Sequence, residues 1–196
     1  MDAVPGKTIL IFFAPEARNS AEGSLLLWPQ NLAGVGQTMA NAEDKEDTME
    51  NRLQEYARLV VEVGVNVQKG QNLIIAAPVE CADFARLCAK AAYAAGCREV
   101  IMSWRDDVLT REKYLHAAED VFDTVPEWVR HFYNGYAEEG AAYLAISATD
   151  PENLKGVASD RIVRNQRASS EALKPFNRLQ MQNSFPWCIV SIPIPS

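Results

Sequence analysis

Metal-binding side chains are the first candidates for chemistry, and this sequence has few of them. Its two histidines are His116 and His131. Each lies in a segment of helical periodicity, and a helix start expected at Thr124 separates them. There is no HExxH motif and no Cys/His pair at zinc-site spacing. Because a two-metal hydrolase needs several converging carboxylates and imidazoles, we expect no metal ligand here and place both histidines on or near helix surfaces.

The turn Pro78–Cys81 follows a predicted strand, where a phosphate loop or a nucleophile would lie. It contains no glycine, Glu80 would repel a phosphate, and neither GxGxxG nor the Walker pattern occurs. Cys81 lies near a predicted helix N-terminus, where the helix dipole can lower the pKa of a thiol. Two interpretations remain for Cys81, a catalytic thiol or a packed core cysteine.

A polar cluster, Ser103–Asp107, follows the next predicted strand. Ligands of open α/β sheets bind beyond the carboxyl ends of the strands. Trp104 together with Asp106 and Asp107 would suit a substrate amine. The two aspartates are equally suited to a solvated loop before the helix expected at Thr110. We assign no catalytic, substrate-binding or metal-binding residue from these patterns.

The elements that must position these residues alternate between strands and helices. Short apolar runs predict strands at Leu73–Ala77, Glu99–Trp104, Ala142–Ser147 and Trp187–Ile192. Helical spacing predicts helices from Asn51 to a stop at Gly64, around Phe84, from Thr110, from Thr124, and over Ser159–Gln182 with a break at Pro175. This alternation predicts an α/β fold, a mostly parallel sheet with helices on both faces in a Rossmann-like layered domain.

Bulk properties exclude several classes of protein. The formal net charge of −7 and the absence of a Lys/Arg cluster argue against binding to nucleic acid or to anionic membranes. No apolar run approaches the ~20 residues of a membrane span. The four cysteines include no CxxC pair and are expected to be reduced and buried, as in a cytoplasmic protein.

Several segments together resemble the thermophilic metalloaminopeptidases of the aminopeptidase T and aminopeptidase PepS type. The resemblance runs from about Met49 to Ser196. It is carried by Leu53–Gln71, Ala77–Glu80, Trp104–Asp107, Leu109–Arg111, Tyr114–Ala117, Asp150–Pro151, Trp187–Val190 and Ile192–Pro193. It implies a cytoplasmic, homodimeric exopeptidase that removes N-terminal amino acids from peptide substrates with two divalent metal ions (zinc, cobalt or manganese). The family's metal ligands belong to its second half, so none carries over to a position here.

The two ends of the chain are expected to differ from an ordinary complete domain. Residues 1–48 show no sustained period and end in a charge run, which predicts an irregular extension, disordered or not native, before a natural start at Met49. Residues 49–196 are expected to be the N-terminal α/β domain of the family. We expect that domain to be incomplete at its C-terminus, without the catalytic domain, with an apolar face bare on its last strand, and inactive alone. The alternative is a freestanding, non-catalytic α/β module that binds a small molecule.

Overall fold

The computed structural model describes residues 9–12, 49–148 and 152–192, and within them five strands form one parallel sheet. The order across the sheet is β1-β5-β4-β2-β3. The strands are β1 (Ile9–Phe12), β2 (Asn72–Pro78), β3 (Glu99–Arg105), β4 (Ala142–Ser147) and β5 (Trp187–Ser191). All four neighbouring pairs are parallel, which confirms the predicted sheet.

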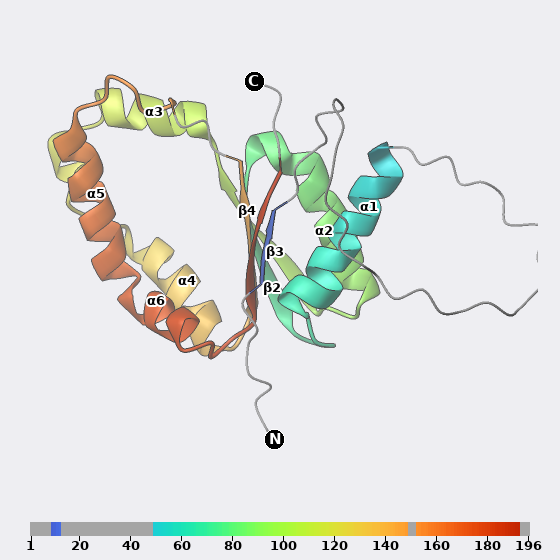
Figure 1. Ribbon diagram of the computed structural model, residues 1–196. Helices are drawn as coiled ribbons and strands as arrows, with labels where there is room; N and C mark the ends of the chain where they lie inside the picture. Colours follow the sequence, from blue (N-terminus) through green and yellow to red (C-terminus); the bar gives the residue numbers. More distant parts are fainter. Residues whose placement is uncertain (1–8, 13–48, 149–151, 193–196) are drawn as a thin grey trace, which may run out of the picture.

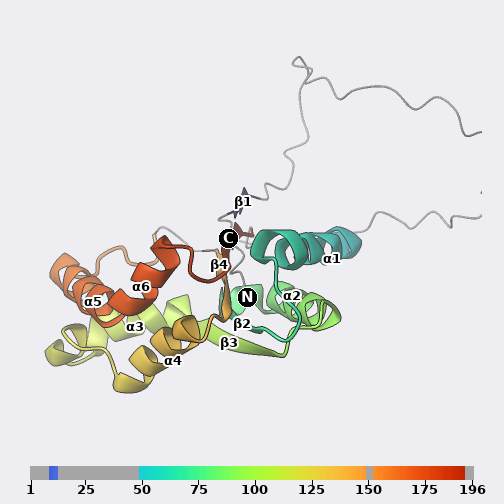
Figure 2. The ribbon, with the colours of Figure 1, turned by 90° about the horizontal axis from the view of Figure 1, so that it is seen from below.

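Helices cover both faces of this sheet, also as predicted (Figure 1). One face carries α1 (Met49–Leu59), its π-helical continuation Val60–Val65, and α2 (Ala82–Ala94). The other face carries the layer of α3 (Asp107–His116), α4 (Glu127–Glu138), α5 (Ser159–Ala172) and α6 (Lys174–Met181). Figure 2 shows the two layers on opposite sides of the strands. None of the helices described is long and apolar enough to cross a membrane.

Each layer encloses its own hydrophobic cluster, because successive strand residues point to opposite faces. On the α1–α2 side, Leu73, Ile75 and Leu144 are fully buried in the larger cluster. On the α4–α6 side, the smaller cluster is mostly aromatic. It contains Ala137, Phe176, Phe185 and Trp187, with Tyr133, Tyr143, Leu173, Leu179 and Ile189 packed against them.

The last strand lies inside the sheet, and helices cover both of its faces. The expectation of a bare apolar face on it is therefore wrong. β5 has β1 on one side and β4 on the other. Cys188 and Val190 are fully buried against the α1–α2 layer, and Trp187 belongs to the aromatic cluster. Residues 1–48 were expected to be irregular, but Ile9–Phe12 within them form strand β1. The remainder of that segment lies outside the described residues.

Two helix starts differ from the sequence prediction. α3 begins at Asp107, and the carboxylate of Asp106 caps it by accepting from the Leu109 backbone N–H at 2.9 Å. The Thr110 hydroxyl donates instead to the Asp106 carbonyl. α4 begins after Pro126 without a side-chain cap, and the Thr124 hydroxyl donates back to the Asp120 carbonyl. Thr110 lies inside α3, and the residue at the N-cap of α4 is Pro126, so both predicted caps are wrong.

The first helix also differs at both ends. α1 already includes Met49 and Glu50, so Asn51 lies inside the helix. Gly64 does not end the helix, because the chain continues through the π-helical turn to Asn66, whose left-handed φ of 56° terminates it. Asparagine tolerates this conformation better than most residues. The break predicted at Pro175 is confirmed, since α5 ends at Ala172 and Pro175 lies in the first turn of α6.

Candidate functional site

The carboxyl ends of β2 and β3 bring together most of the residues that the sequence singled out. Pro78 at the end of β2 lies in register with Arg105 at the end of β3. Since the strands are parallel, the turn through Cys81 and the loop through Asp107 leave the sheet at the same edge. The charges of Arg105 and Asp107 both act on the Cys81 thiol. This carboxyl edge is therefore the candidate site, as in other open α/β sheets.

The acidic side chains at this edge are engaged within the fold. Asp107 Oδ1 accepts from Arg105 Nε at 3.0 Å, and Asp106 caps α3. The Asp107 carbonyl accepts from Asn153 Nδ2 at 2.9 Å. Arg111 in turn donates to the Asn153 carbonyl. These contacts tie the β3–α3 loop to the segment that precedes α5, so the two aspartates hold the loop in place. The arrangement favours the loop interpretation over an amine-binding site.

The cluster Ser103–Asp107 is also divided between the two faces of the sheet. The Ser103 hydroxyl shares a 2.6 Å hydrogen bond with the Tyr133 hydroxyl of α4. Trp104 is in register with Ala77, which is buried in the cluster on the α1–α2 side. Neighbouring residues in register share a face, so Trp104 points away from Ser103. The cluster does not form one binding surface.

Cys81 has the environment of a core cysteine. It is 4% exposed and belongs to the larger hydrophobic cluster. Burial raises the pKa of its thiol, the charges of Glu80 and Asp107 raise that pKa further, and Arg105 partly opposes them. A raised pKa keeps the thiol protonated and poorly nucleophilic. The geometry therefore favours packing over catalysis at Cys81.

Both histidines lie on helix surfaces, as predicted. His116 on α3 is paired with Glu112 at 3.4 Å, and its side chain is 74% exposed. His131 on α4 is 82% exposed, with Nδ1 2.8 Å from the Glu127 carbonyl oxygen. Each imidazole thus interacts with a residue of its own helix. Across residues 49–148 and 152–192, no group of three or more His, Cys, Asp or Glu side chains is placed to hold a metal ion.

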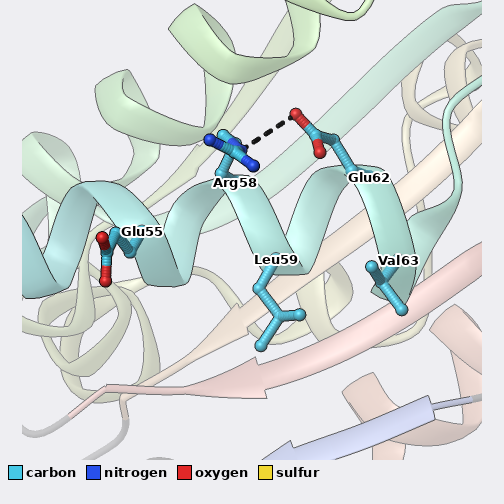
Figure 3. Close-up of a pocket in the computed structure, with 5 residues that line it drawn as sticks. All are labelled: Glu55, Arg58, Leu59, Glu62 and Val63. Atoms are coloured by element: carbon cyan, nitrogen blue, oxygen red, sulfur yellow. Dashed lines mark ion pairs between the residues drawn. The ribbon is translucent and has the colours of Figure 1, made fainter. Parts of the chain in front are cut away.

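Two surface hollows lie away from the carboxyl edge. The first is on the outer side of α1 and its continuation, lined by Glu55, Arg58, Leu59, Glu62 and Val63. Figure 3 shows Arg58 and Glu62 turned toward each other, while Leu59 and Val63 point away from that pair. The Arg58–Glu62 contact is 3.3 Å long and exposed to solvent. Its polar groups are Glu55 and the Arg58–Glu62 pair, and no cysteine, serine or histidine lines it.

The second hollow is basic and lies between α4 and the α5–α6 junction. Its lining residues are Arg130, Glu171, Ala172, Lys174, Pro175 and Arg178. Arg130 is paired with Glu127 at 2.6 Å and Lys174 with Glu171 at 3.6 Å, which offsets two of the three cationic side chains. Neither hollow was predicted from the sequence. In the second, residues from three helices meet only in the folded chain, and no local pattern links them.

Comparison with known proteins gives a consistent relationship. The profile of a family described as thermophilic metalloprotease (M29) matches residues 49–196. Aminopeptidase AmpS of Bacillus subtilis is 37% identical over 144 residues, which are 74% of this chain and 35% of that protein. Aminopeptidase PepS of Streptococcus thermophilus is 34% identical over 139 residues, 71% of this chain and 34% of that protein.

A solved structure gives the same relationship in three dimensions. Wild-type AmpT from Thermus thermophilus aligns with a TM-score of 0.70 and 34% identity, covering 74% of this chain and 36% of that chain. The chain therefore spans about a third of the length of the relatives that it matches.

Proposed function

This chain belongs to the thermophilic metalloprotease family M29, and on that premise we propose that it forms the N-terminal α/β domain of a metal-dependent aminopeptidase. In the proposed function, the whole protein releases N-terminal amino acids from peptides. The support is the family match over residues 49–196, together with relatives at 34–38% identity that are all aminopeptidases. We place the domain at residues 49–196, with residues 1–48 as an extension that precedes it.

The described residues do not fit the metal centre that the family name implies. They contain no group of three metal-ligating side chains, and both histidines lie exposed on separate helices. We therefore propose that the divalent ions, two of zinc, cobalt or manganese, are held by residues that belong to the other two thirds of a family-length protein. The role of this domain is structural, since it presents a rigid parallel sheet and its carboxyl edge.

A freestanding small-molecule-binding module has less support than this role. Such a module would need polar groups converging on an open pocket. At the carboxyl edge, Asp106 and Asp107 are engaged in the cap and the ion pair that hold the loop. Ser103 and Trp104 point to opposite faces of the sheet.

Location and assembly follow as further parts of the proposal. We propose a cytoplasmic protein, supported by four cysteines that are buried and form no disulfide within the described residues. Burial also raises the pKa of Cys88 to about 12 and that of Cys188 to about 11. Such thiols are stable in a reducing compartment. We propose a homodimer for the whole protein, as the family resemblance implies, and size-exclusion chromatography with light scattering tests that assembly.

The proposed function predicts that this chain has no peptidase activity alone. Purified protein, free of host aminopeptidases, is incubated with leucyl and arginyl p-nitroanilide, with and without zinc, cobalt or manganese. We expect no turnover above the buffer rate and no metal bound at one equivalent or more by equilibrium dialysis. Metal-dependent turnover that co-purifies with the chain would contradict the assignment of the metal centre to other residues.

A further inference from the structure

Four large apolar side chains are exposed at the carboxyl edge of the sheet. They are Val79 after β2, Trp104 at the end of β3, and Val108 and Leu109 in the first turn of α3. Their exposed fractions are 40%, 44%, 66% and 67%. We call these four residues the edge patch. They follow or end two strands that are paired with each other, so all four lie at the carboxyl edge of the sheet, with Trp104 toward the α1–α2 side and Val108 and Leu109 on α3 of the other layer.

The polar side chains around the edge patch are mostly directed into the fold. Asp106 caps α3, and Asp107 is paired with Arg105. Arg111 donates to the carbonyls of Asn153 and Lys155. What this part of the surface offers outward is therefore the four apolar side chains with two charged neighbours, Glu80 and Arg105, whose side chain is 47% exposed. An apolar surface with a few charges around it is typical of a protein–protein contact.

The position of β5 indicates what covers the edge patch. β5 is parallel to the other strands, so its end at Ser191 lies at the same carboxyl edge. Relatives of this chain are about three times as long as the part that it matches. In a family-length protein with this domain at its N-terminus, the polypeptide that follows β5 continues from this same carboxyl edge, with β4 between β5 and β2.

We propose that the edge patch is the docking surface for the polypeptide that follows position 196 in a family-length protein. The inference rests on the proposed function, because it requires that this chain be the N-terminal domain. Covalent linkage raises the effective concentration of that polypeptide and so strengthens contacts that also form between the separate pieces.

A second copy of the chain fits the edge patch less well. A stable dimer buries about 800 Å² on each partner, more than four side chains provide. The net charge of −7 also makes two copies repel each other. Self-association through this surface is therefore weak compared with docking of a linked segment.

The test compares the accessibility of two engineered thiols. L109C lies in the edge patch, and V163C is the matched control, because Val163 on α5 is 61% exposed and lies outside the patch. Each variant is made in the 196-residue chain and in a chimera. In the chimera, Ser196 is followed by the part of Bacillus subtilis AmpS that lies beyond its matched region. The native cysteines are at most 8% exposed, so maleimide labelling followed by mass spectrometry reports mainly the new thiol.

In the short chain, we expect L109C and V163C to react at rates within threefold of each other. In the chimera, we expect the L109C rate to fall at least tenfold while the V163C rate changes less than threefold. Unchanged L109C labelling in a folded chimera would overturn the proposal. So would L109C protection in the short chain that grows with protein concentration, because that result assigns the surface to a second copy.

A second measurement tests the proposal if the chimera does not fold. The short chain is titrated calorimetrically with the separately produced remainder of AmpS. We expect the two pieces to bind. The V108D/L109D pair should lower the affinity at least tenfold, and the control pair V163D/M181D should change it less than threefold. No binding, or equal effects of the two pairs, overturns the proposal. Aminopeptidase activity of the chimera is measured in parallel, so the two proposals fail separately. An active chimera with an accessible position 109 refutes the docking surface alone, and a protected but inactive chimera refutes the proposed function.

Discussion

Replacement of Phe176 by alanine tests whether the α4–α6 layer is held to the sheet by its aromatic cluster. Phe176 is 6% exposed, and its ring lies 5.2 Å from that of Tyr143 on β4, 5.4 Å from Phe185 and 5.7 Å from Tyr133. Removing a buried phenylalanine ring costs about 3–5 kcal/mol. A domain of this size has a total stability of roughly 5–15 kcal/mol, so Phe176→Ala should remove a large part of it.

The matched control is Phe132→Ala on the outer side of the same layer. The Phe132 ring contacts Tyr133 and Tyr136 of its own helix, at 5.0 and 5.3 Å between ring centroids. Because Phe132 is half-buried, its loss should cost less than that of the buried Phe176. Urea unfolding followed by tryptophan fluorescence measures both variants, and Trp187 lies within the cluster. A Phe176→Ala loss no larger than that of Phe132→Ala would refute the reasoning.

Four further changes have defined expectations, each measured by urea unfolding. Gly135→Ala should stabilise the chain by about 0.5–1 kcal/mol, because a Cβ there meets nothing within 4 Å and glycine is costly inside a helix. Gly96→Ala should destabilise it by at least about 1 kcal/mol, because φ is +90° and the new Cβ would lie 3.2 Å from Lys69 Cγ. Asp106→Ala should cost about 0.5–2 kcal/mol through loss of the α3 cap, and Asp106→Asn should restore most of that loss. Hydrogen bonds from two arginines of α5 lower the pKa of Glu119 below its ordinary 4.5. Its stabilisation is therefore present above that value and is lost as the pH falls through the lowered pKa, so the gap between wild type and Glu119→Gln should close in acid.

The strands were predictable because buried apolar runs mark them directly. The prediction of Leu73–Ala77 differs from β2 by one residue at each end, and Ala142–Ser147 coincides with β4. Strand order has no such signal. The position of β5 between β1 and β4 depends on a four-residue strand, Ile9–Phe12, that is too short to show a period. The predicted bare face on the last strand was wrong because helix layers cover both faces of β5, and those contacts form only on folding.

The candidate site was predictable in its location but not in the roles of its residues. The sequence placed Cys81 and Ser103–Asp107 beyond strand ends. Cys81, Asp106 and Asp107 do follow β2 and β3, whereas Ser103, Trp104 and Arg105 lie within β3. The sequence did not show that the Asp107 carbonyl accepts a hydrogen bond from Asn153, a residue 46 positions away. Nor did it show that Asp106, rather than Thr110, caps α3. Both choices depend on where β3 ends and on contacts that form only on folding.

Aminopeptidase activity of the AmpS chimera tests the central claim most directly. The 196-residue chain, the chimera and intact Bacillus subtilis AmpS are assayed together on leucyl p-nitroanilide, with a divalent metal added or removed by chelation. We expect metal-dependent turnover by the chimera and by AmpS, and none by the short chain. A monodisperse chimera with native circular dichroism but no turnover, beside active AmpS, would contradict the assignment of this chain as the N-terminal domain of such an enzyme.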